Sequence, residues 1–234
     1  MSNATELREQ QVAELQAEAQ GWNAQQLLRW GLSQFGSSLA VASSFGAEDV
    51  VLIDMASRIS KFRVFTLDTD FLFSETYSLI GEIEARYAVE VERTRSELTP
   101  EAQAAQYGPA LWASRPDACC QLRKVEPLKK KLADLSAWVT GVRRDQAPTR
   151  ANTRKLEWDA KFGLAKLNPL ADWNWSEVWD YIRAHNVPYN PLHDRDYPSI
   201  GCTWCTRPVK PGEDPRAGRW SGFAKAECGL HIKD

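Results

Sequence analysis

Five cysteines in three groups are the feature of this 234-residue chain with the clearest chemical meaning. Cys119 and Cys120 are adjacent, Cys202 and Cys205 are separated by two residues, and Cys228 stands alone near the C-terminus. In a chain of the reducing cytosol, such clustering indicates metal or redox chemistry rather than disulfides. The alternative is that all five are buried and act as small hydrophobic residues.

Four of these cysteines could together hold a metal centre. Four thiolates suit either zinc or an iron–sulfur cluster. A zinc site usually draws on two pairs with the C-x-x-C spacing, whereas adjacent residues on a helix do not face the same way. The irons of a cubane occupy separate corners, so Cys119 and Cys120 could each bind one. We therefore predict a [4Fe–4S] cluster on Cys119, Cys120, Cys202 and Cys205, with zinc as the alternative.

Lys124 lies about one helical turn beyond the adjacent pair of cysteines. Its ammonium group could place positive charge between the cluster and an anionic substrate. The alternative is a solvated lysine on the surface of a helix.

The remaining cysteine, Cys228, precedes His231 by three residues. A nearby histidinium or lysine lowers the pKa of a thiol and so raises the population of the nucleophilic thiolate. Gly229 allows the backbone to flex. These features would suit a nucleophile, but a lone cysteine near a chain end, taken by itself, is more often incidental.

Two turns at the ends of expected strands could bind a nucleotide. Ser44 and Gly46 lie between an apolar run and a helix-like stretch, where free N–H groups at the helix start can bind a phosphate. Leu67 and Asp68 end the next strand and could offer backbone groups to an adenine or side chains to a ribose. Ordinary turn and capping chemistry explains both segments equally well when each is taken alone.

Arginines follow the fourth expected strand and precede the tail. They are Arg143, Arg144, Arg216 and Arg219. Guanidinium forks suit the oxygens of phosphate and sulfate. Exposed, solubilising charge is the other interpretation.

The elements that must position these residues alternate along the chain. Apolar runs at 39–45, 63–69, 88–94 and 137–142, with a further candidate at 164–168, alternate with helical patterns. This order predicts an α/β fold with a mostly parallel sheet, helices on both faces, and ligands at the carboxyl ends of the strands. We expect an N-terminal helical segment (1–36), a nucleotide-binding and cluster domain (37–205) and a flexible C-terminal tail (206–234).

The composition narrows the class of protein. Hydrophobic residues make up 43% and charged residues 26%, which is typical of a soluble globular chain. The formal net charge of -2 argues against general affinity for nucleic acid or anionic membranes. The acidic N-terminal stretch is unlike a secretory signal, and no apolar run is long enough for a membrane helix. We expect a cytoplasmic protein without nucleic-acid or membrane partners.

Taken together, these motifs resemble the adenylylsulfate/phosphoadenylylsulfate reductase family over about residues 38–231. The most specific segments are 119–127, 140–146, 197–205, 212–219 and 227–231. The resemblance implies a Rossmann-like, adenine-nucleotide α-hydrolase-like fold in which residues 44–49 take the place of a pyrophosphate-binding loop. ATP-cleaving relatives carry a lysine near Ala47, and its absence here fits a substrate with a single phosphate.

The four cysteines resemble the cluster-bearing branch of that family, which typically prefers adenosine 5′-phosphosulfate. The resemblance implies thioredoxin-dependent reduction of this substrate to sulfite and AMP, in assimilatory sulfate reduction and cysteine biosynthesis. Cys228 would attack the sulfur and form a thiosulfonate, from which thioredoxin or a glutaredoxin-like dithiol would release sulfite. The phosphosulfate would be neutralised by Arg216, Arg219, Lys124 and one of Arg143 or Arg144, with His231 assisting or tuning the thiol.

Three alternatives stay open at this point. The 3′-phosphorylated substrate could be preferred or shared. A tRNA thiolase on the same kind of fold would need ATP and a basic RNA-binding face, and both Ala47 and the net charge speak against it. A zinc-stabilised binding protein without catalysis is the third. The sequence leaves the oligomeric state open, a homo-oligomer included.

Overall fold

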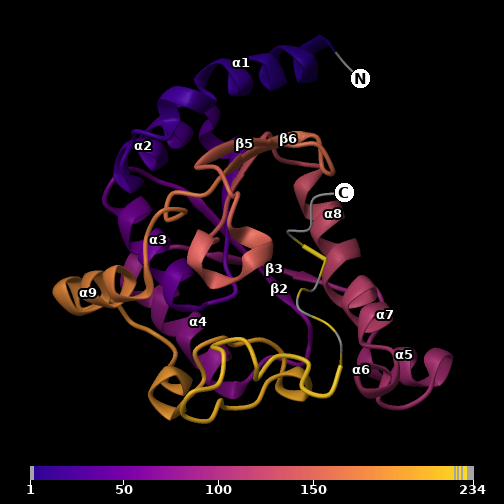
Figure 1. Ribbon diagram of the computed structural model, residues 1–234. Coiled ribbons are helices and arrows are strands. Elements are labelled where there is room, and N and C mark those ends of the chain that lie inside the picture. Colours follow the sequence, from indigo (N-terminus) through magenta and orange to yellow (C-terminus); the bar gives the residue numbers. More distant parts are fainter. Residues whose placement is uncertain (1–2, 224, 226, 228, 231–234) are drawn as a thin grey trace.

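A six-stranded sheet forms the centre of the computed structural model, which describes residues 3–223, 225, 227, 229 and 230 (Figure 1). The strands are β1 (Leu39–Ala42), β2 (Arg63–Asp68), β3 (Val91–Arg95), β4 (Ala137–Val139), β5 (Leu156–Asp159) and β6 (Leu164–Leu167). Their order is β3-β2-β1-β4-β6-β5, and every neighbouring pair is parallel except β5 with β6. The prediction of a mostly parallel α/β sheet is confirmed.

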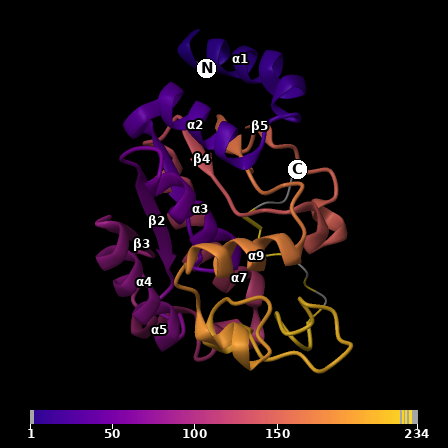
Figure 2. The same ribbon diagram turned by 90° about the vertical axis from the view of Figure 1, so that its left-hand side faces the viewer.

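Helices cover both faces of this sheet. On one face lie α2 (Ala24–Phe35), α3 (Ala47–Ser57), α4 (Ser74–Tyr87) and α9 (Trp175–His185), with α3 packed against α9 (Figure 2). Leu27, Val51 and Val178 from these helices share one buried cluster with Val41 of β1. On the other face α8 (Glu126–Leu132) places Leu128 against the sheet. Burial on both faces explains why the central strands are almost continuously apolar.

The predicted N-terminal helical segment consists of two helices, α1 (Asn3–Ala19) and α2. Asn23 caps the start of α2 and so separates the two helices. Its side chain accepts from the Gln26 backbone N–H, and the Gln26 side chain accepts from the Asn23 N–H. Val12 of α1 and Leu27 of α2 belong to the same buried cluster as the sheet. The segment therefore packs as part of the main hydrophobic core.

Strand β5 was not predicted from the sequence. It is four residues long and carries Glu157 in a buried position, where Lys166 of β6 lies 3.5 Å away across the antiparallel pair. The turn into β6 ends at Gly163, whose positive φ of 70° favours glycine. A short run with a charged interior position lacks the apolar pattern by which strands are recognised.

The chain around the adjacent cysteines is not a regular helix. Three short helices lead into it, α5 (Pro100–Tyr107), α6 (Leu111–Ser114) and α7 (Pro116–Cys120). One π-helical turn, Gln121–Val125, then joins α7 to α8, and Pro127 lies in the first turn of α8, where its missing N–H is tolerated. Such wider turns occur often at functional sites. Here the turn carries Arg123 and Lys124.

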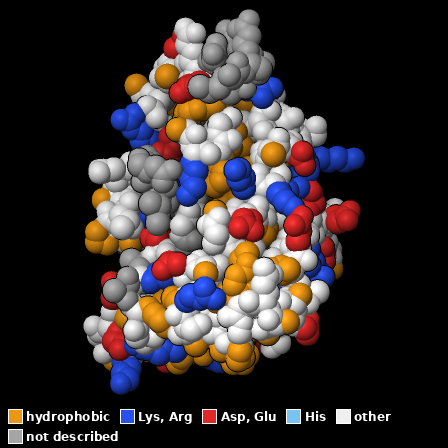
Figure 3. All heavy atoms as spheres, turned by 90° about the vertical axis from the view of Figure 1, so that its right-hand side faces the viewer, with side chains coloured by type: hydrophobic (Ala, Val, Ile, Leu, Met, Phe, Trp, Pro, Cys, Tyr) orange, Lys and Arg blue, Asp and Glu red, His pale blue; other side chains and the backbone are white. Residues whose placement is uncertain are grey.

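The surface carries both signs of charge. On the face at the right-hand side of Figure 1, positive and negative side chains are interspersed, and hydrophobic side chains gather toward its lower part (Figure 3). Among the residues that the structure describes, no helix is both long enough and apolar enough to cross a bilayer.

Candidate active site

A cavity of about 380 Å³ lies at the ends of β1 and β4, where the strand order of the sheet reverses. Strands β1 and β4 are neighbours, but the chain leaves them toward opposite edges of the sheet. The cavity is lined by the turn after β1, the end of β2, the loop after β4 and the C-terminal segment. Ligands of open α/β sheets bind in the crevice at such a reversal, and the volume suits a small ligand such as a nucleotide.

The turn after β1 is closed by a carboxylate of the protein itself. Asp49, in the first turn of α3 and only 8% exposed, accepts hydrogen bonds from the Ser44 backbone N–H at 2.6 Å and the Ser44 hydroxyl at 2.8 Å. Gly141 from the loop after β4 approaches closely, because a Cβ there would lie 2.4 Å from Asp49 Oδ1. The Ser44 donors that could hold a phosphate are therefore engaged by an internal anion.

Burial raises the pKa of Asp49 to about 6, and Glu48 adds to the rise, although the Ser44 hydrogen bonds oppose it. Since the folded state then favours the neutral acid, this group stabilises the fold below about pH 4. That contribution is lost as the pH rises through about 6.

Replacing Asp49 with asparagine should remove this pH dependence. A rise in pKa from 3.8 to about 6 corresponds to about 3 kcal/mol. As the pH rises from 4 to 7, the wild type should therefore lose about that much free energy of unfolding relative to Asp49→Asn, which has no carboxyl group to ionise at this position. Urea unfolding across that range measures it, with the exposed Asp134→Asn as the control. Parallel stability curves for Asp49→Asn and the wild type would contradict the assignment.

Cationic side chains also line the cavity. They are Lys124, Arg143, Arg150, Arg216 and Arg219. Arg143 donates to Glu48 at 2.9 Å. Arg219 donates to the Ser199 hydroxyl at 3.0 Å and passes so close to Gly201 that a Cβ there would lie 2.5 Å from its Nη2. The glycine before Cys202 thus makes room for an arginine at the cavity.

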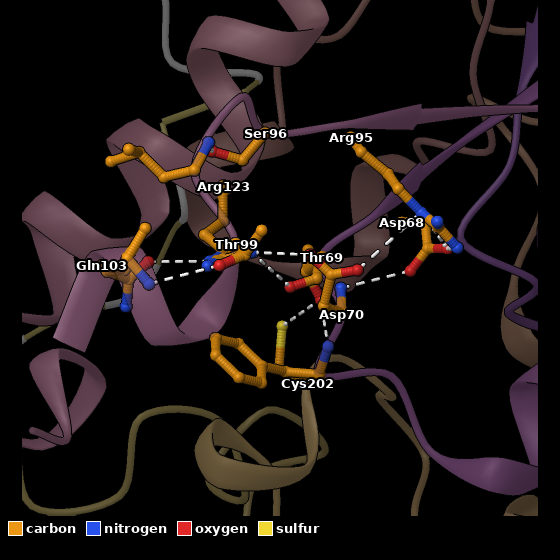
Figure 4. Close-up of polar contacts among 12 residues, drawn as sticks. Asp68, Thr69, Asp70, Arg95, Ser96, Thr99, Gln103, Arg123 and Cys202 are labelled. Carbon is orange, nitrogen blue, oxygen red and sulfur yellow. Dashed lines mark hydrogen bonds and ion pairs between the residues drawn. The ribbon is translucent and has the colours of Figure 1, made fainter. Parts of the chain in front are cut away.

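A second, smaller cavity adjoins the first and is lined by all four clustered cysteines. Cys119, Cys120 and Cys202 are buried and Cys205 is half-buried. The Thr69 hydroxyl lies 3.2 Å from Cys202 Sγ (Figure 4). Burial and the neighbouring thiols raise the pKa of Cys119 to about 12 and that of Cys205 to about 11. Bound cationic irons would offset this mutual repulsion, because metal ligation requires the thiolate form.

The small cavity is also lined by an arginine with a buried donor that meets no acceptor in the described part of the chain. Arg123 is 1% exposed and stacks on Phe71, with its Nε donating to Gln103 at 2.7 Å and its Nη1 to Asp70 at 2.7 Å (Figure 4). Its Nη2 is buried without a hydrogen-bond partner among the residues that the structure describes. Because an unsatisfied buried donor is costly, an anionic group among the thiols would suit this position.

The four thiols line one and the same cavity. Among the described His, Cys, Asp and Glu side chains, no three are arranged to hold a single metal ion. Lys124 lines both cavities and so stands between the thiols and the larger one.

Residues 38–208 match the model of the phosphoadenosine phosphosulfate reductase domain. The chain belongs to this reductase family. A relative from Halalkalibacterium halodurans named adenosine 5′-phosphosulfate reductase is 52% identical over 88% of this chain and 90% of its own length. Adenosine 5′-phosphosulfate reductase 2 of Bacillus subtilis is 48% identical over 88% of each chain.

Solved structures agree with the family and the fold. The phosphoadenylyl-sulfate reductase of Candida auris superimposes with a TM-score of 0.71 at 31% identity, covering 82% of this chain and 94% of that one. Yeast FAD synthetase, at 14% identity and a TM-score of 0.56, covers 86% of this chain and 76% of its own. That second likeness shows the fold alone, and the predicted adenine-nucleotide α-hydrolase-like architecture is confirmed.

Within this reductase fold, most of the predicted ligand-binding residues line the larger cavity. They are Ser44, Gly46, Leu67, Lys124, Arg143, Arg216 and Arg219. Cys228 and His231 lie outside the described residues.

Two predicted residues, Asp68 and Arg144, are not among those that line the larger cavity. Asp68 is fully buried and accepts from the Tyr77 hydroxyl at 2.7 Å. It also accepts from Arg95 at 2.6 Å, and Figure 4 shows this contact. Arg144 donates to the Thr153 carbonyl at 2.8 Å and to Gln20. Of the two adjacent arginines only Arg143 lines the cavity, since Arg144 begins the 3-10 turn Arg144–Gln146 and donates away from it.

Several cavity residues were missed by sequence reasoning. The sequence pattern indicated Glu48 and Asp49 only as part of the segment 44–49, and Arg150 was not among the candidate arginines. Glu227 was overlooked beside Cys228, although a carboxylate next to a proposed nucleophile is a usable signal. In the structure Arg150 and Glu227 pair at 2.8 Å.

Proposed function

We propose that this chain reduces adenosine 5′-phosphosulfate to sulfite and AMP, with thioredoxin or a similar dithiol as the reductant. The observation that carries the proposal is the adjacency of two cavities, one nucleotide-sized with arginines and one lined by four thiols, joined by Lys124. Relatives at 44–52% identity that bear the name of this activity support it.

The turn after β1 supports the substrate with one phosphate over its 3′-phosphorylated form. Asp49 already accepts from both Ser44 donors, and Glu48 adds a second carboxylate to the same part of the wall. A further phosphate close to this turn would meet two acidic groups and occupied donors. Desolvated like charges of this kind cost affinity.

Cys119, Cys120, Cys202 and Cys205 would hold a [4Fe–4S] cluster. When bound, the cluster supplies fixed charge that organises the site, whereas the two electrons come from the dithiol. Lys124 would stand between these cysteines and the substrate, and Arg216 and Arg219 would neutralise the phosphosulfate. Arg123 would donate from its buried Nη2 toward the four-thiol cavity.

The reaction would proceed in two nucleophilic steps. The Cys228 thiolate attacks the sulfate sulfur, the bond from sulfur to the phosphate oxygen breaks, and AMP leaves with the electron pair. The sulfonate on Cys228 is then displaced when a thiolate of the reductant attacks Cys228 Sγ, so that sulfite leaves with the pair of the S–S bond. The second thiol of the reductant resolves the mixed disulfide, which frees Cys228 and oxidises the dithiol. His231 would assist at the sulfate end or tune the Cys228 thiol.

We also propose that residues 206–234 act as the mobile unit that carries Cys228 between substrate and reductant, with residues 37–205 holding the nucleotide and the cluster. Positions near a chain end open at low cost. The reaction would take place in the cytoplasm, where thiols are kept reduced.

Replacing Lys124 with alanine should reduce kcat/KM for adenosine 5′-phosphosulfate by about 100-fold, since one preorganised charge at the reacting group is lost. Iron and acid-labile sulfide per chain should stay at the wild-type level, because none of the four thiols is altered. Lys129→Ala, an exposed substitution on α8, serves as the matched control. Unchanged turnover of Lys124→Ala with an intact cluster would contradict the proposed electrostatic role of Lys124.

The proposed function is tested by steady-state assays of anaerobically purified protein. We expect sulfite and AMP in equal amounts from adenosine 5′-phosphosulfate with thioredoxin, and a kcat/KM at least about tenfold lower for the 3′-phosphorylated substrate. The reverse preference would assign the alternative reductase activity. Bound zinc without sulfide, together with no turnover of either nucleotide, would favour the non-catalytic binding protein and overturn the proposal.

A further inference from the structure

The C-terminal segment places a buried carboxylate next to the proposed nucleophile. Glu227 directly precedes Cys228 and is 9% exposed. Arg150 donates to it with a two-armed fork, from Nε to Oε1 at 2.8 Å and from Nη2 to Oε2 at 2.8 Å. Arg216 adds a donor at 3.2 Å and Thr149 one at 3.4 Å. A carboxylate so far removed from water is stable only while it is paired, so its partners fix the position of residue 227.

The residues that follow position 228 are also held at the cavity. The Gly229 carbonyl accepts from Lys161 Nζ at 3.1 Å, and Gly229 has a φ of 83°, which favours glycine. Leu230 lines the larger cavity and packs against the cluster that contains Phe65 and Leu128. The described neighbours of residue 228 on both sides are thus attached to the body of the protein.

Arg150 is itself held in place by hydrogen bonds to residues at the reversal of the strand order. Its Nη1 donates to Gln146 Oε1 at 2.5 Å, and Gln146 Nε2 donates to Glu48 Oε1 at 2.9 Å. The fork that receives Glu227 is therefore connected to the start of α3. Such a preorganised arginine loses little freedom when a carboxylate docks on it.

Two ion pairs bracket this part of the segment, and they differ in burial. In the pair of Arg150 with Glu227 the side chains are 12% and 7% exposed, whereas Asp117, the partner of Lys225, is 86% exposed. Solvent-exposed pairs contribute little, while loss of one partner of a buried pair leaves an uncompensated charge. Between these two pairs, that of Glu227 with Arg150 holds the segment.

We propose that Glu227 is a positioning residue whose pairing with Arg150 latches the segment carrying Cys228 over the cavity. This inference rests on the proposed function for the reaction steps that it separates. Sulfonyl transfer to Cys228 requires the latch to be closed, because the substrate lies inside the cavity. Attack by the reductant requires it to be open, because a cavity of about 380 Å³ cannot admit a protein.

Glu227→Gln tests the latch, since it keeps the shape of the side chain and removes its charge. Glu227→Asp retains the charge and should restore part of the effect. Glu213→Gln is the matched control, because Glu213 lies in the same segment and also pairs with a forked arginine, Arg207 at 2.8 Å and 3.2 Å, but away from the cavity. Circular dichroism establishes that each variant is folded.

The first measurement needs no substrate. Under native conditions, trypsin should cleave after Lys225 about tenfold faster in Glu227→Gln than in the wild type, because the open form is more populated. Glu213→Gln should match the wild type. Equal cleavage rates for Glu227→Gln and the wild type would overturn the latch.

The second measurement separates the two reaction steps in single-turnover experiments. The rate of sulfonate addition to Cys228 should fall at least about tenfold in Glu227→Gln, and release of sulfite from the preformed adduct by dithiothreitol should be unchanged or faster. Slower release, or slower addition without faster proteolysis, would contradict a latch. If wild-type protein forms no adduct at all, the proposed function fails, and the proteolysis result still decides the latch.

Discussion

Replacing Cys228 with serine should abolish reduction of adenosine 5′-phosphosulfate, with kcat falling about 10⁴-fold or more, since the proposed mechanism assigns the nucleophilic attack to this thiol. A serine hydroxyl is far less ionised than a thiol at neutral pH and cannot form the S–S bond from which a dithiol releases sulfite. Sulfite production with thioredoxin present, followed over several hours, measures the effect.

Iron content provides the control for that variant. Cys228 is not one of the four cysteines that we propose as ligands, so Cys228→Ser should contain as much iron and sulfide as the wild type. Binding of AMP should also be retained. Loss of iron from Cys228→Ser would show that this cysteine is a ligand and would remove it from the proposed chemistry.

Replacing Cys202 with serine should have the second large effect, the loss of the cluster itself. Cys202 is buried in the four-thiol cavity and lies 3.2 Å from the Thr69 hydroxyl, so a serine leaves three thiols around a space suited to four. We expect iron and acid-labile sulfide below about a tenth of the wild-type level and turnover reduced about 100-fold or more. Colorimetric iron and sulfide analysis of anaerobically purified protein checks this.

The two cysteine variants therefore test the division of roles together. Cys228→Ser should be inactive with iron, and Cys202→Ser inactive without it. Thr203→Ser, which alters the residue beside Cys202, should keep both iron and activity. Full iron content and sulfide in Cys202→Ser would contradict its assignment as a ligand.

The fold could be predicted from the sequence because its signals are local. Apolar runs such as 39–45 and 63–69 coincide with β1 and β2, and the helical pattern after the second run coincides with α4. The four cysteines could be grouped for a similar reason, because paired spacing is unusual outside metal sites. The structure brings all four to one cavity, while their role as cluster ligands stays a prediction.

What the sequence did not reveal depends on contacts between distant segments. Asp49 lies so close to Gly141, from the loop after β4, that a side chain at position 141 would collide with it. The pairing of Arg150 with Glu227 joins two loops with no pattern in common. Strand β5 carries its buried charge only because Lys166 lies opposite. Such charge pairing in the interior has no signature in local periodicity.

The most direct measurement of the central claim is the mass of the peptide that contains Cys228. Protein incubated with adenosine 5′-phosphosulfate in the absence of reductant should gain the mass of one sulfonate on that peptide, with one AMP released per chain. Addition of thioredoxin should remove the added mass and yield sulfite. An active enzyme whose Cys228 peptide never acquires this mass would contradict the account.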